Sequence, residues 1–177
     1  ADFAYIKKVF NDGFCDLSQE RLESFIKNYP QTQYLYQAHI LLGRSYYKQN
    51  NYSRALYEFQ TILSYTAAAE FQDEALYWSG EIHTNNNDFK SALEYYEKVI
   101  GDFPASKYLG YAVYSKGWVY YRLGFYDEAI KCFEEVVSKY PMDKVSMDDQ
   151  FRLGECQYLS ARYEKAEEDL DRFIENY

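Results

Sequence analysis

Apolar residues recur along this chain at the spacing of an α-helix, in segments separated by short polar turns. In YQAHILLGRSYYKQ the apolar positions follow one another at three and four residues, as in an amphipathic helix. In FKSALEYYEKVIGDFP one stripe is formed in the same way by Ala92, Tyr96, Val99 and Ile100. No segment shows the sustained alternation that a half-buried strand requires. The pattern therefore predicts an all-α protein.

The helical segments repeat with a period of 37 residues. Glycine keeps this step at Gly43, Gly80, Gly117 and Gly154. Alanine keeps it at Ala55, Ala92, Ala129 and Ala166. A third register holds Pro30, Pro104 and Pro141, with Ala67 in the slot between the first two. Registers that share one period indicate tandem units. Each unit reads as two helices joined by a turn such as NNYS, NNDF, LGFYD or SARY.

The small residues of each unit have a steric role. Glycine inside a helix costs about 1 kcal/mol relative to alanine, so a glycine that recurs at one register position is best explained by packing. We expect Gly43 and its equivalents to let the second helix of a unit approach the first. Ala55 and its equivalents would do the same from the second helix, and Ala129 is predicted to be fully buried.

This frame resembles the tetratricopeptide repeat family, whose pattern is W-x2-L-G-x2-Y, then A-x3-F, then P. In one unit the matching positions are Val113, Lys116, Gly117, Tyr120, Ala129, Phe133 and Pro141. The first position is never tryptophan, and Lys116 and Gln157 stand where apolar or aromatic residues are usual. The resemblance covers nearly the whole chain. It implies a right-handed α-solenoid of about five stacked antiparallel helix pairs, in units of about 1–30, 31–67, 68–104, 105–141 and 142–177.

The period exceeds the 34 residues usual in that family. The extra three fall between the proline and the next glycine, as in FPASKYLGYAVYSKG, and we expect them to add about one turn to each first helix. The spacing is similar to that of bacterial cell-envelope members, such as the lipoprotein component of the outer-membrane assembly machine and the periplasmic accessory protein of the Tol–Pal system. This likeness favours the periplasm or cell envelope and leaves the cytoplasm open.

The repeat continues toward both ends of the chain. Ser18 stands where the alanine is expected, so FCDLSQERLESFIKNYP reads as the second helix of a first unit and DFAYIKKVFN as its shortened first helix. At the other end, ENY stops one residue before the expected proline. We therefore expect a single array over residues 1–177 that is a segment of a longer protein.

Composition narrows the classes of function. The formal net charge of −9 gives no attraction to phosphate backbones, so a nucleic-acid partner is not expected. No run of about 18 apolar residues is present, so this segment is not expected to insert into a membrane. Aromatic residues make up 20% of the chain, mostly tyrosine, which suits half-buried surfaces. Cys15, Cys132 and Cys156 lack the spacing of a zinc site or a disulfide framework and are expected to be free.

The sequence offers no catalytic constellation. His39 and His83 lie on the repeat grid and not at metal spacing, and the glycines are spaced singly within helices. Neither G-x-S-x-G nor H-E-x-x-H occurs. Acidic runs such as KCFEE read as solvated helix faces. We therefore expect no enzyme activity, no catalytic residue, no metal and no cofactor.

Protein binding is the remaining class, and the resemblance implies that the first helix of each unit lines a concave face. The candidates on the side away from the second helix are Arg44, Tyr47, Tyr77, Glu81, Tyr111, Tyr114, Trp118, Tyr121, Arg122, Phe151 and Tyr158. Aromatic rings clustered on one face are typical of a binding hot spot. The same rings could instead pack neighbouring units together.

Two functions stay open, beside a third reading in which the array regulates an enzyme whose catalytic domain lies outside this segment. The leading one is a non-catalytic scaffold that binds a peptide or protein segment in the aromatic-rich groove, either extended or as an amphipathic helix. Family members that bind acidic chaperone C-termini use a clamp of lysines and asparagines, which this chain lacks. Acidic side chains near the groove would favour a partner segment that carries Lys or Arg. They are Glu74, Glu81, Asp148 and Glu155. The alternative is a structural spacer or self-association module within a larger envelope protein.

Overall fold

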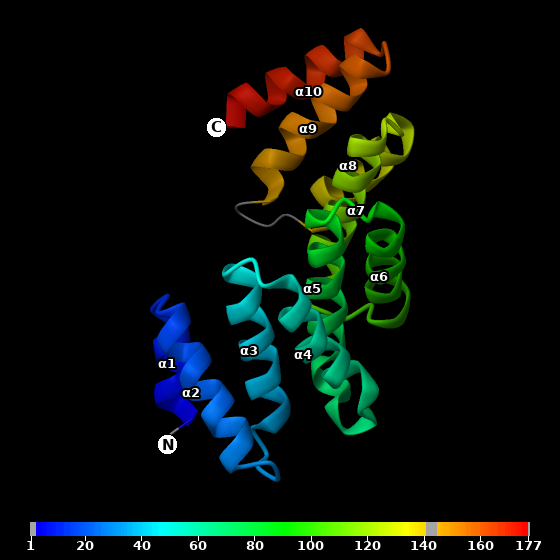
Figure 1. Cartoon of the computed structure of the whole chain (residues 1–177). Coiled ribbons are helices and arrows are strands. Elements are labelled where there is room, and N and C mark those ends of the chain that lie inside the picture. Colours follow the sequence, from blue (N-terminus) through cyan, green and yellow to red (C-terminus); the bar gives the residue numbers. More distant parts are fainter. Residues whose placement is uncertain (1–2, 141–144, 177) are drawn as a thin grey trace. The chain divides into compact units, whose positions relative to one another are not determined.

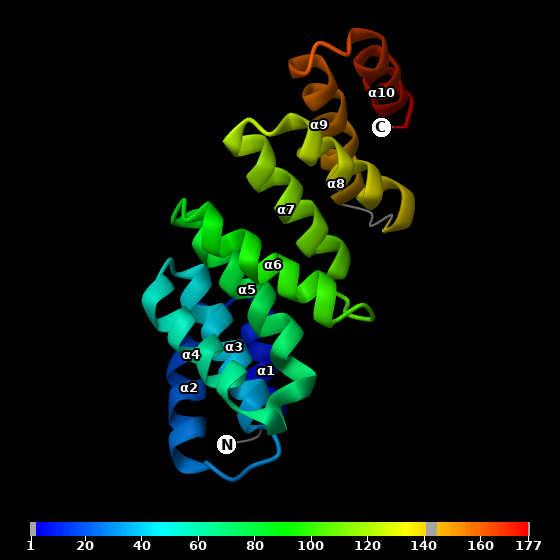
Figure 2. The same cartoon turned by 90° about the vertical axis from the view of Figure 1, so that its right-hand side faces the viewer.

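The chain is all-α, as predicted. A computed structural model describes residues 3–140 and 145–176, with the backbone alone for 145–149 and 176. Over these residues it contains ten α-helices, one 3-10 helix and no strand (Figures 1 and 2). The helices divide into two compact units, Ala1–Asn86 and Asn87–Tyr177.

In the first unit, successive helices pack against each other. They are α1 (Phe3–Asn11), α2 (Cys15–Asn28), α3 (Leu35–Lys48), α4 (Tyr52–Ser64), the 3-10 helix η1 (Thr66–Phe71) and α5 (Gln72–Asn85). Helix α3 contacts α2 and α4, and the first helices α1 and α5 each contact α3 as well. The short α1 and the fully buried Ser18 in α2 confirm the first helix pair that the repeat predicts.

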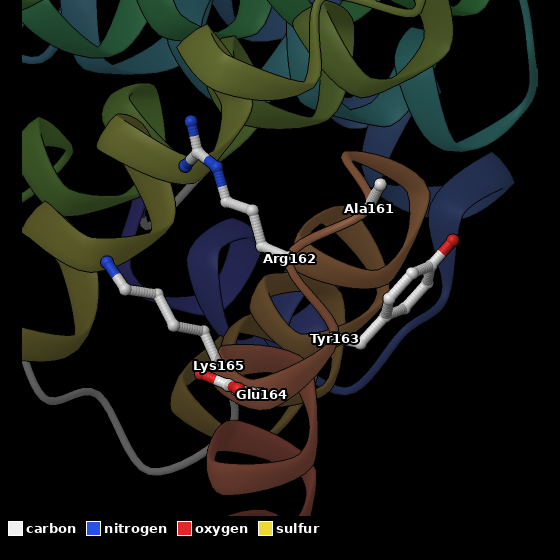
Figure 3. A pocket seen from close by; sticks show the side chains of 5 residues that line it. All are labelled: Ala161, Arg162, Tyr163, Glu164 and Lys165. Atoms are coloured by element: carbon white, nitrogen blue, oxygen red, sulfur yellow. The ribbon is translucent and has the colours of Figure 1, made fainter.

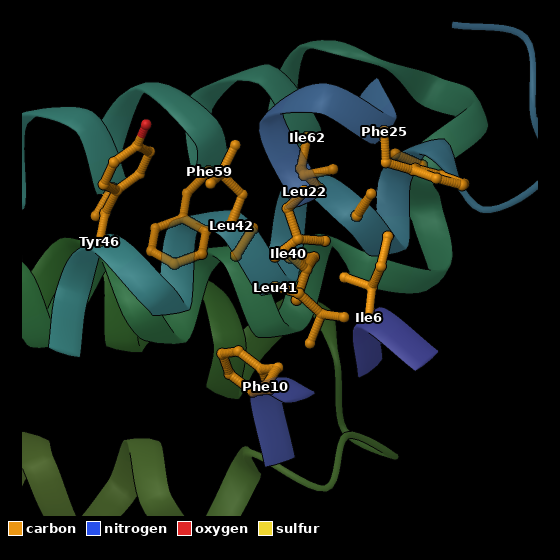
Figure 4. Packing of buried hydrophobic residues seen from close by; sticks show 14 of the residues in the cluster. Ile6, Phe10, Leu22, Phe25, Ile40, Leu41, Leu42, Tyr46, Phe59 and Ile62 are labelled. Atoms are coloured by element: carbon orange, nitrogen blue, oxygen red, sulfur yellow. The ribbon is translucent and has the colours of Figure 1, made fainter. Parts of the chain in front are cut away.

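One apolar core runs through the first unit (Figure 4). Side chains from α1, α2, α3 and α4 converge in it, among them Ile6, Leu22, Leu42, Phe59 and Ile62. Burying an apolar side chain of this size stabilises the fold by about 1.5–3 kcal/mol. The stability of this unit therefore comes from contacts between adjacent helices.

The second unit repeats this arrangement with α6 (Phe89–Asp102), α7 (Leu109–Leu123), α8 (Tyr126–Lys139), α9 (Val145–Leu159) and α10 (Tyr163–Asn176). Each of these helices contacts the next, and the first helices α7 and α9 also contact each other. Core clusters are formed by Val113, Ala129, Ile130, Cys132, Phe133, Val136, Leu153 and Cys156.

The repeated glycines Gly43, Gly117 and Gly154 lie where two helices touch. A Cβ atom added to Gly43 would lie 2.6 Å from the Phe59 ring, and one added to Gly117 would lie 2.9 Å from Cβ of Cys132. The repeated alanines are buried: Ala55, Ala92 and Ala129 fully, and Ala166 nearly so. The steric role predicted for both registers is confirmed.

The turn inside each pair contains a left-handed residue at one further repeat position. Backbone φ is positive at Gly13, Asn50, Asn87, Gly124 and Ala161, which follow one another at the same 37-residue step. After Gly13, Asn50, Gly124 and Ala161, the next amide donates to a carbonyl oxygen five residues earlier, as from Asn51 to Tyr46 at 2.9 Å. This is a Schellman motif. Three residue types share this register, which conceals it in the sequence.

Before α3 and α7, the three extra residues of the unit lie in the connection between pairs, so the extra helical turn predicted there is wrong. Helix α3 begins at Leu35, five residues after Pro30, and α7 begins at Leu109, five residues after Pro104. Both prolines follow the end of a second helix, as expected. Pro141 lies outside the described residues.

Local hydrogen bonds explain why these connections are turns. The Ser106 hydroxyl accepts from the amide of Tyr108 at 2.9 Å, and the Thr32 hydroxyl accepts from the amide of Tyr34 at 3.4 Å. Such side-chain bonds compete with the helix for the same amides. At the intervening connection, where alanine replaces proline, the chain forms η1 instead.

Candidate functional site

In the first unit the predicted binding face centres on Arg44 of α3. Its guanidinium lies over the Phe10 ring at 5.1 Å and over the Trp78 ring at 5.4 Å. Its Nη1 donates to Oε1 of Glu74 at 3.1 Å. Cation–π contacts are worth about 0.5–1 kcal/mol each at exposed sites. Arg44 therefore joins the three first helices α1, α3 and α5, and its own chain holds it in place.

Tyr47 lies one turn further along α3 and is held in the same way. Its ring packs against Trp78 at 5.0 Å, and its hydroxyl accepts from Nδ2 of Asn85 at 2.9 Å. Burial raises the pKa of Tyr47. On α5, Tyr77 is buried with its ring edge-on to Trp78 at 5.3 Å, and Glu81 is half-buried. Most predicted residues of this unit therefore already pack against side chains of their own chain.

In the second unit, α7 carries a row of rings at helical spacing. Trp118 is half-buried, and the guanidinium of Arg122 lies over it at 4.7 Å. Tyr111 is 37% exposed. Tyr114 packs against Phe133 of the core at 5.9 Å. Tyr114 is therefore partly a core residue, whereas Tyr111 and Trp118 reach the surface.

Tyr121 connects α7 to α9. Its hydroxyl donates to Oε1 of Glu155 at 3.0 Å, and burial together with this carboxylate raises the pKa of Tyr121. Arg152 lies over the Tyr121 ring at 5.4 Å and donates to Oε2 of Glu155 at 2.7 Å. Glu155 is thus neutralised within the chain, as Glu74 is by Arg44. These two carboxylates are therefore poorly placed to attract a basic segment.

Helix α9 contributes the most exposed of the predicted rings. Phe151 is 40% exposed and Tyr158 is 59% exposed, and each packs against a ring of α10, at 5.7 Å and 5.4 Å. The side chain of Asp148 lies outside the described residues. The surface residues of these two helices are called the α7–α9 face below; they are Tyr111, Trp118, Tyr121, Arg122, Phe151 and Tyr158.

The side chains of His39, Cys132 and Cys156 are explained by packing within the fold. Nδ1 of His39 lies 2.6 Å from Oε2 of Glu58 and joins α3 to α4. The three cysteines are free, and burial raises the pKa of Cys132 to about 11 and of Cys156 to about 12. In the part of the chain that the structure describes, no group of three or more His, Cys, Asp or Glu side chains could hold a metal ion. No described helix is long and apolar enough to cross a membrane.

Two pockets are lined by residues other than those of the α7–α9 face. One, of about 500 Å³, is lined by residues 161–165 at the α9–α10 turn; in Figure 3, Arg162 and Lys165 extend toward α8 whereas Tyr163 points away. The other, of about 290 Å³, lies between α8, α9 and α10. It is lined by Glu134, Val137, Leu153, Gln157, Lys165, Glu168, Asp169 and Arg172.

Comparison with known proteins places these helices in a common fold. Family profiles described as tetratricopeptide repeat match residues 10–72, 40–107, 110–143 and 150–177. Among solved structures, MamA from Desulfovibrio magneticus RS-1 has a TM-score of 0.78 at 17% identity, over 97% of this chain and 90% of that one. The C-terminal part of a TPR repeat-containing protein from Cytophaga hutchinsonii has a TM-score of 0.81 at 17% identity, over 98% and 64%. No curated protein matches. At these identities the structural likeness shows the fold alone.

Proposed function

Because this chain belongs to the tetratricopeptide repeat family, we propose that it is a non-catalytic scaffold that binds a protein segment on the first helices of its repeats. Stacked helix pairs of this kind create extended binding surfaces. The observation that carries the proposal is the α7–α9 face, where partly exposed rings are held in place by neighbouring polar side chains.

The α7–α9 face is preorganised for binding. Arg122 lies over Trp118, and Glu155 accepts from the Tyr121 hydroxyl. Immobilising a free side chain costs about 0.5–1.5 kcal/mol on binding, and rings that are already fixed avoid much of that cost. Tyr, Trp and Arg are also the residues enriched in binding hot spots. The composition and the fixed geometry therefore favour contact with a partner.

The partner segment is proposed to be apolar and aromatic. Glu155 is already paired with Arg152, so the contribution of negative charge is small. An amphipathic helix presents apolar side chains at i, i+3, i+4 and i+7, and Tyr111 and Trp118 stand seven residues apart on α7. An extended segment with apolar side chains on one edge would use the same rings.

The test begins with peptides selected from a displayed library against the 177-residue chain, followed by calorimetric titration. Trp118→Ala and Phe151→Ala should each weaken binding at least about thirtyfold, because hot-spot truncation costs about 2 kcal/mol or more. The control is Tyr57→Ala, since Tyr57 is an exposed ring on the second helix α4.

Circular dichroism must show that each variant is folded. Equal weakening by Tyr57→Ala, or no weakening by either face variant, would refute the proposed surface. If Trp118→Ala instead dissociates an oligomer in sedimentation, the face serves self-association.

A further inference from the structure

The pocket between α8, α9 and α10 lies at a repeat position that a tyrosine occupies elsewhere in the chain. Gln157 follows Tyr120 by one 37-residue period and Tyr46 by three. Its side chain is 1% exposed and lines the pocket of about 290 Å³. The departure from tyrosine, visible in the sequence, thus coincides with a cavity.

The first unit shows what the tyrosine does at this position. Tyr46 of α3 is 5% exposed (Figure 4). Its hydroxyl donates to the carboxylate of Glu23 on α2, and the guanidinium of Arg54 on α4 lies over its ring at 5.5 Å. The ring therefore fills the space between α2, α3 and α4, with an acceptor at its tip and a cation on its face.

The last repeat of the second unit keeps the two charged partners and has Gln157 in place of the ring. Glu134 of α8 and Lys165 of α10 stand three periods after Glu23 and Arg54, and both line the pocket. Glutamine has the polar end of a side chain but no ring, so the volume that the phenol takes in the first unit is open here. At about 290 Å³, the opening is at the small end of ligand pockets and suits a single side chain.

The lining of the pocket calls for a hydrogen-bond donor. Oε1 of Gln157 is buried and has no hydrogen-bond partner among the described residues, a condition that is costly to a fold. Glu134, Glu168 and Asp169 add carboxylate acceptors. Arg172 also lines the pocket, and its Nη1 lies 3.4 Å from Oδ1 of Asp169.

We propose that this pocket binds the side chain of a tyrosine from a partner protein. The ring takes the place of the missing phenol beside Lys165, and its hydroxyl donates to Glu134 as Tyr46 donates to Glu23. This site lies on different residues from the α7–α9 face and does not depend on the function proposed for that face.

N-acetyl-tyrosinamide is the probe, titrated into the isotope-labelled 177-residue chain and followed by NMR. We expect saturable shifts of backbone amides in α8, α9 and α10 around the pocket. N-acetyl-phenylalaninamide should bind at least about tenfold more weakly, because it lacks the hydroxyl that donates to the Glu134 carboxylate. Shifts that do not saturate, that lie elsewhere, or that are equal for the two probes would overturn the proposal.

Two variants and one control complete the test. Gln157→Tyr should fill the pocket and abolish binding of the probe, and Glu134→Gln should weaken it about tenfold. Glu97→Gln is the matched control, since Glu97 stands one period before Glu134 and pairs with Lys116 at 3.0 Å outside the pocket. If Gln157→Tyr does not fold, unchanged binding by Glu134→Gln alone would overturn the proposal. If the chain self-associates and Gln157→Tyr abolishes this self-association, the bound tyrosine comes from a second copy of this chain. That result would overturn the assignment to a different protein.

Discussion

A single methyl group at Gly117 tests how closely the helices of a repeat pack. On α7, the new Cβ would lie 2.9 Å from Cβ of Cys132 and 3.0 Å from Cε1 of Phe133. Both residues are buried, and the Cys132 Cβ is attached directly to the α8 backbone, so α7 and α8 must move apart. Overpacking of this kind costs about 1–3 kcal/mol.

Gly101 of α6 provides the matched control in the same unit, because nothing lies within 4 Å of a Cβ added there. Alanine is favoured over glycine in a helix by about 1 kcal/mol, and this gain applies to both variants. Gly101→Ala should therefore stabilise the chain by up to about 1 kcal/mol, and Gly117→Ala should destabilise it by about 0–2 kcal/mol. The difference between them isolates the steric cost.

Urea unfolding followed by circular dichroism measures both variants against the parent chain. The urea midpoint is expected to be highest for Gly101→Ala, intermediate for the parent chain and lowest for Gly117→Ala. Equal shifts in the same direction would refute the close approach of α7 and α8 and the repeat register derived from it.

Ala129→Leu should lower the urea midpoint by the equivalent of about 1–3 kcal/mol, and an unchanged midpoint would contradict the burial of Ala129. Ala161→Gly should stabilise the chain by about 1 kcal/mol, because Ala161 has a φ of 57° that is strained for any residue with a Cβ; a lower midpoint would be evidence against this. The hydrogen bond from Tyr46 lowers the pKa of Glu23 below its ordinary value of 4.5. This hydrogen bond therefore stabilises the fold above pH 4.5, and the stabilisation is lost as the pH falls through the lowered pKa of Glu23 in the folded chain. The stability gap between the parent chain and Tyr46→Phe should therefore narrow in acid, and a gap independent of pH between 3 and 7 would count against the pair. Iodoacetamide at pH 8 should label Cys15 and spare the buried Cys132 and Cys156, because burial raises their pKa values to about 11 and about 12. Mass spectrometry measures the labelling, and equal labelling of all three cysteines would contradict the burial of Cys132 and Cys156.

Periodicity was sufficient to predict the helix pairs and their closest contacts. Glycine and alanine are informative there because a single Cβ decides how near two helices lie, as at Gly43 beside Phe59. The connections before α3 and α7 differ from the prediction, since the competing hydrogen bonds of Thr32 and Ser106 are formed by side chains common in both helices and turns.

The candidate site was predictable only in outline. Helical spacing predicts that Tyr121 lies on the side of α7 away from the second helix of its pair, but its hydrogen bond to Glu155 depends on how α7 and α9 are packed. The same holds for Arg44, whose partners lie on two other helices. In the sequence, Gln157 is visible only as a departure from tyrosine at its repeat position. The pocket beside it could be identified only from the structure.

The most direct test of the proposed binding surface is the fluorescence of Trp118. The chain has two tryptophans, so a Trp78→Phe variant leaves Trp118 as the reporter of the α7–α9 face. Titration with a selected peptide should shift the Trp118 emission saturably to shorter wavelength and protect it from iodide quenching, and Phe151→Ala should move both effects to a higher peptide concentration, in line with its weaker binding. Peptide binding that leaves the emission and the quenching of Trp118 unchanged would contradict the account.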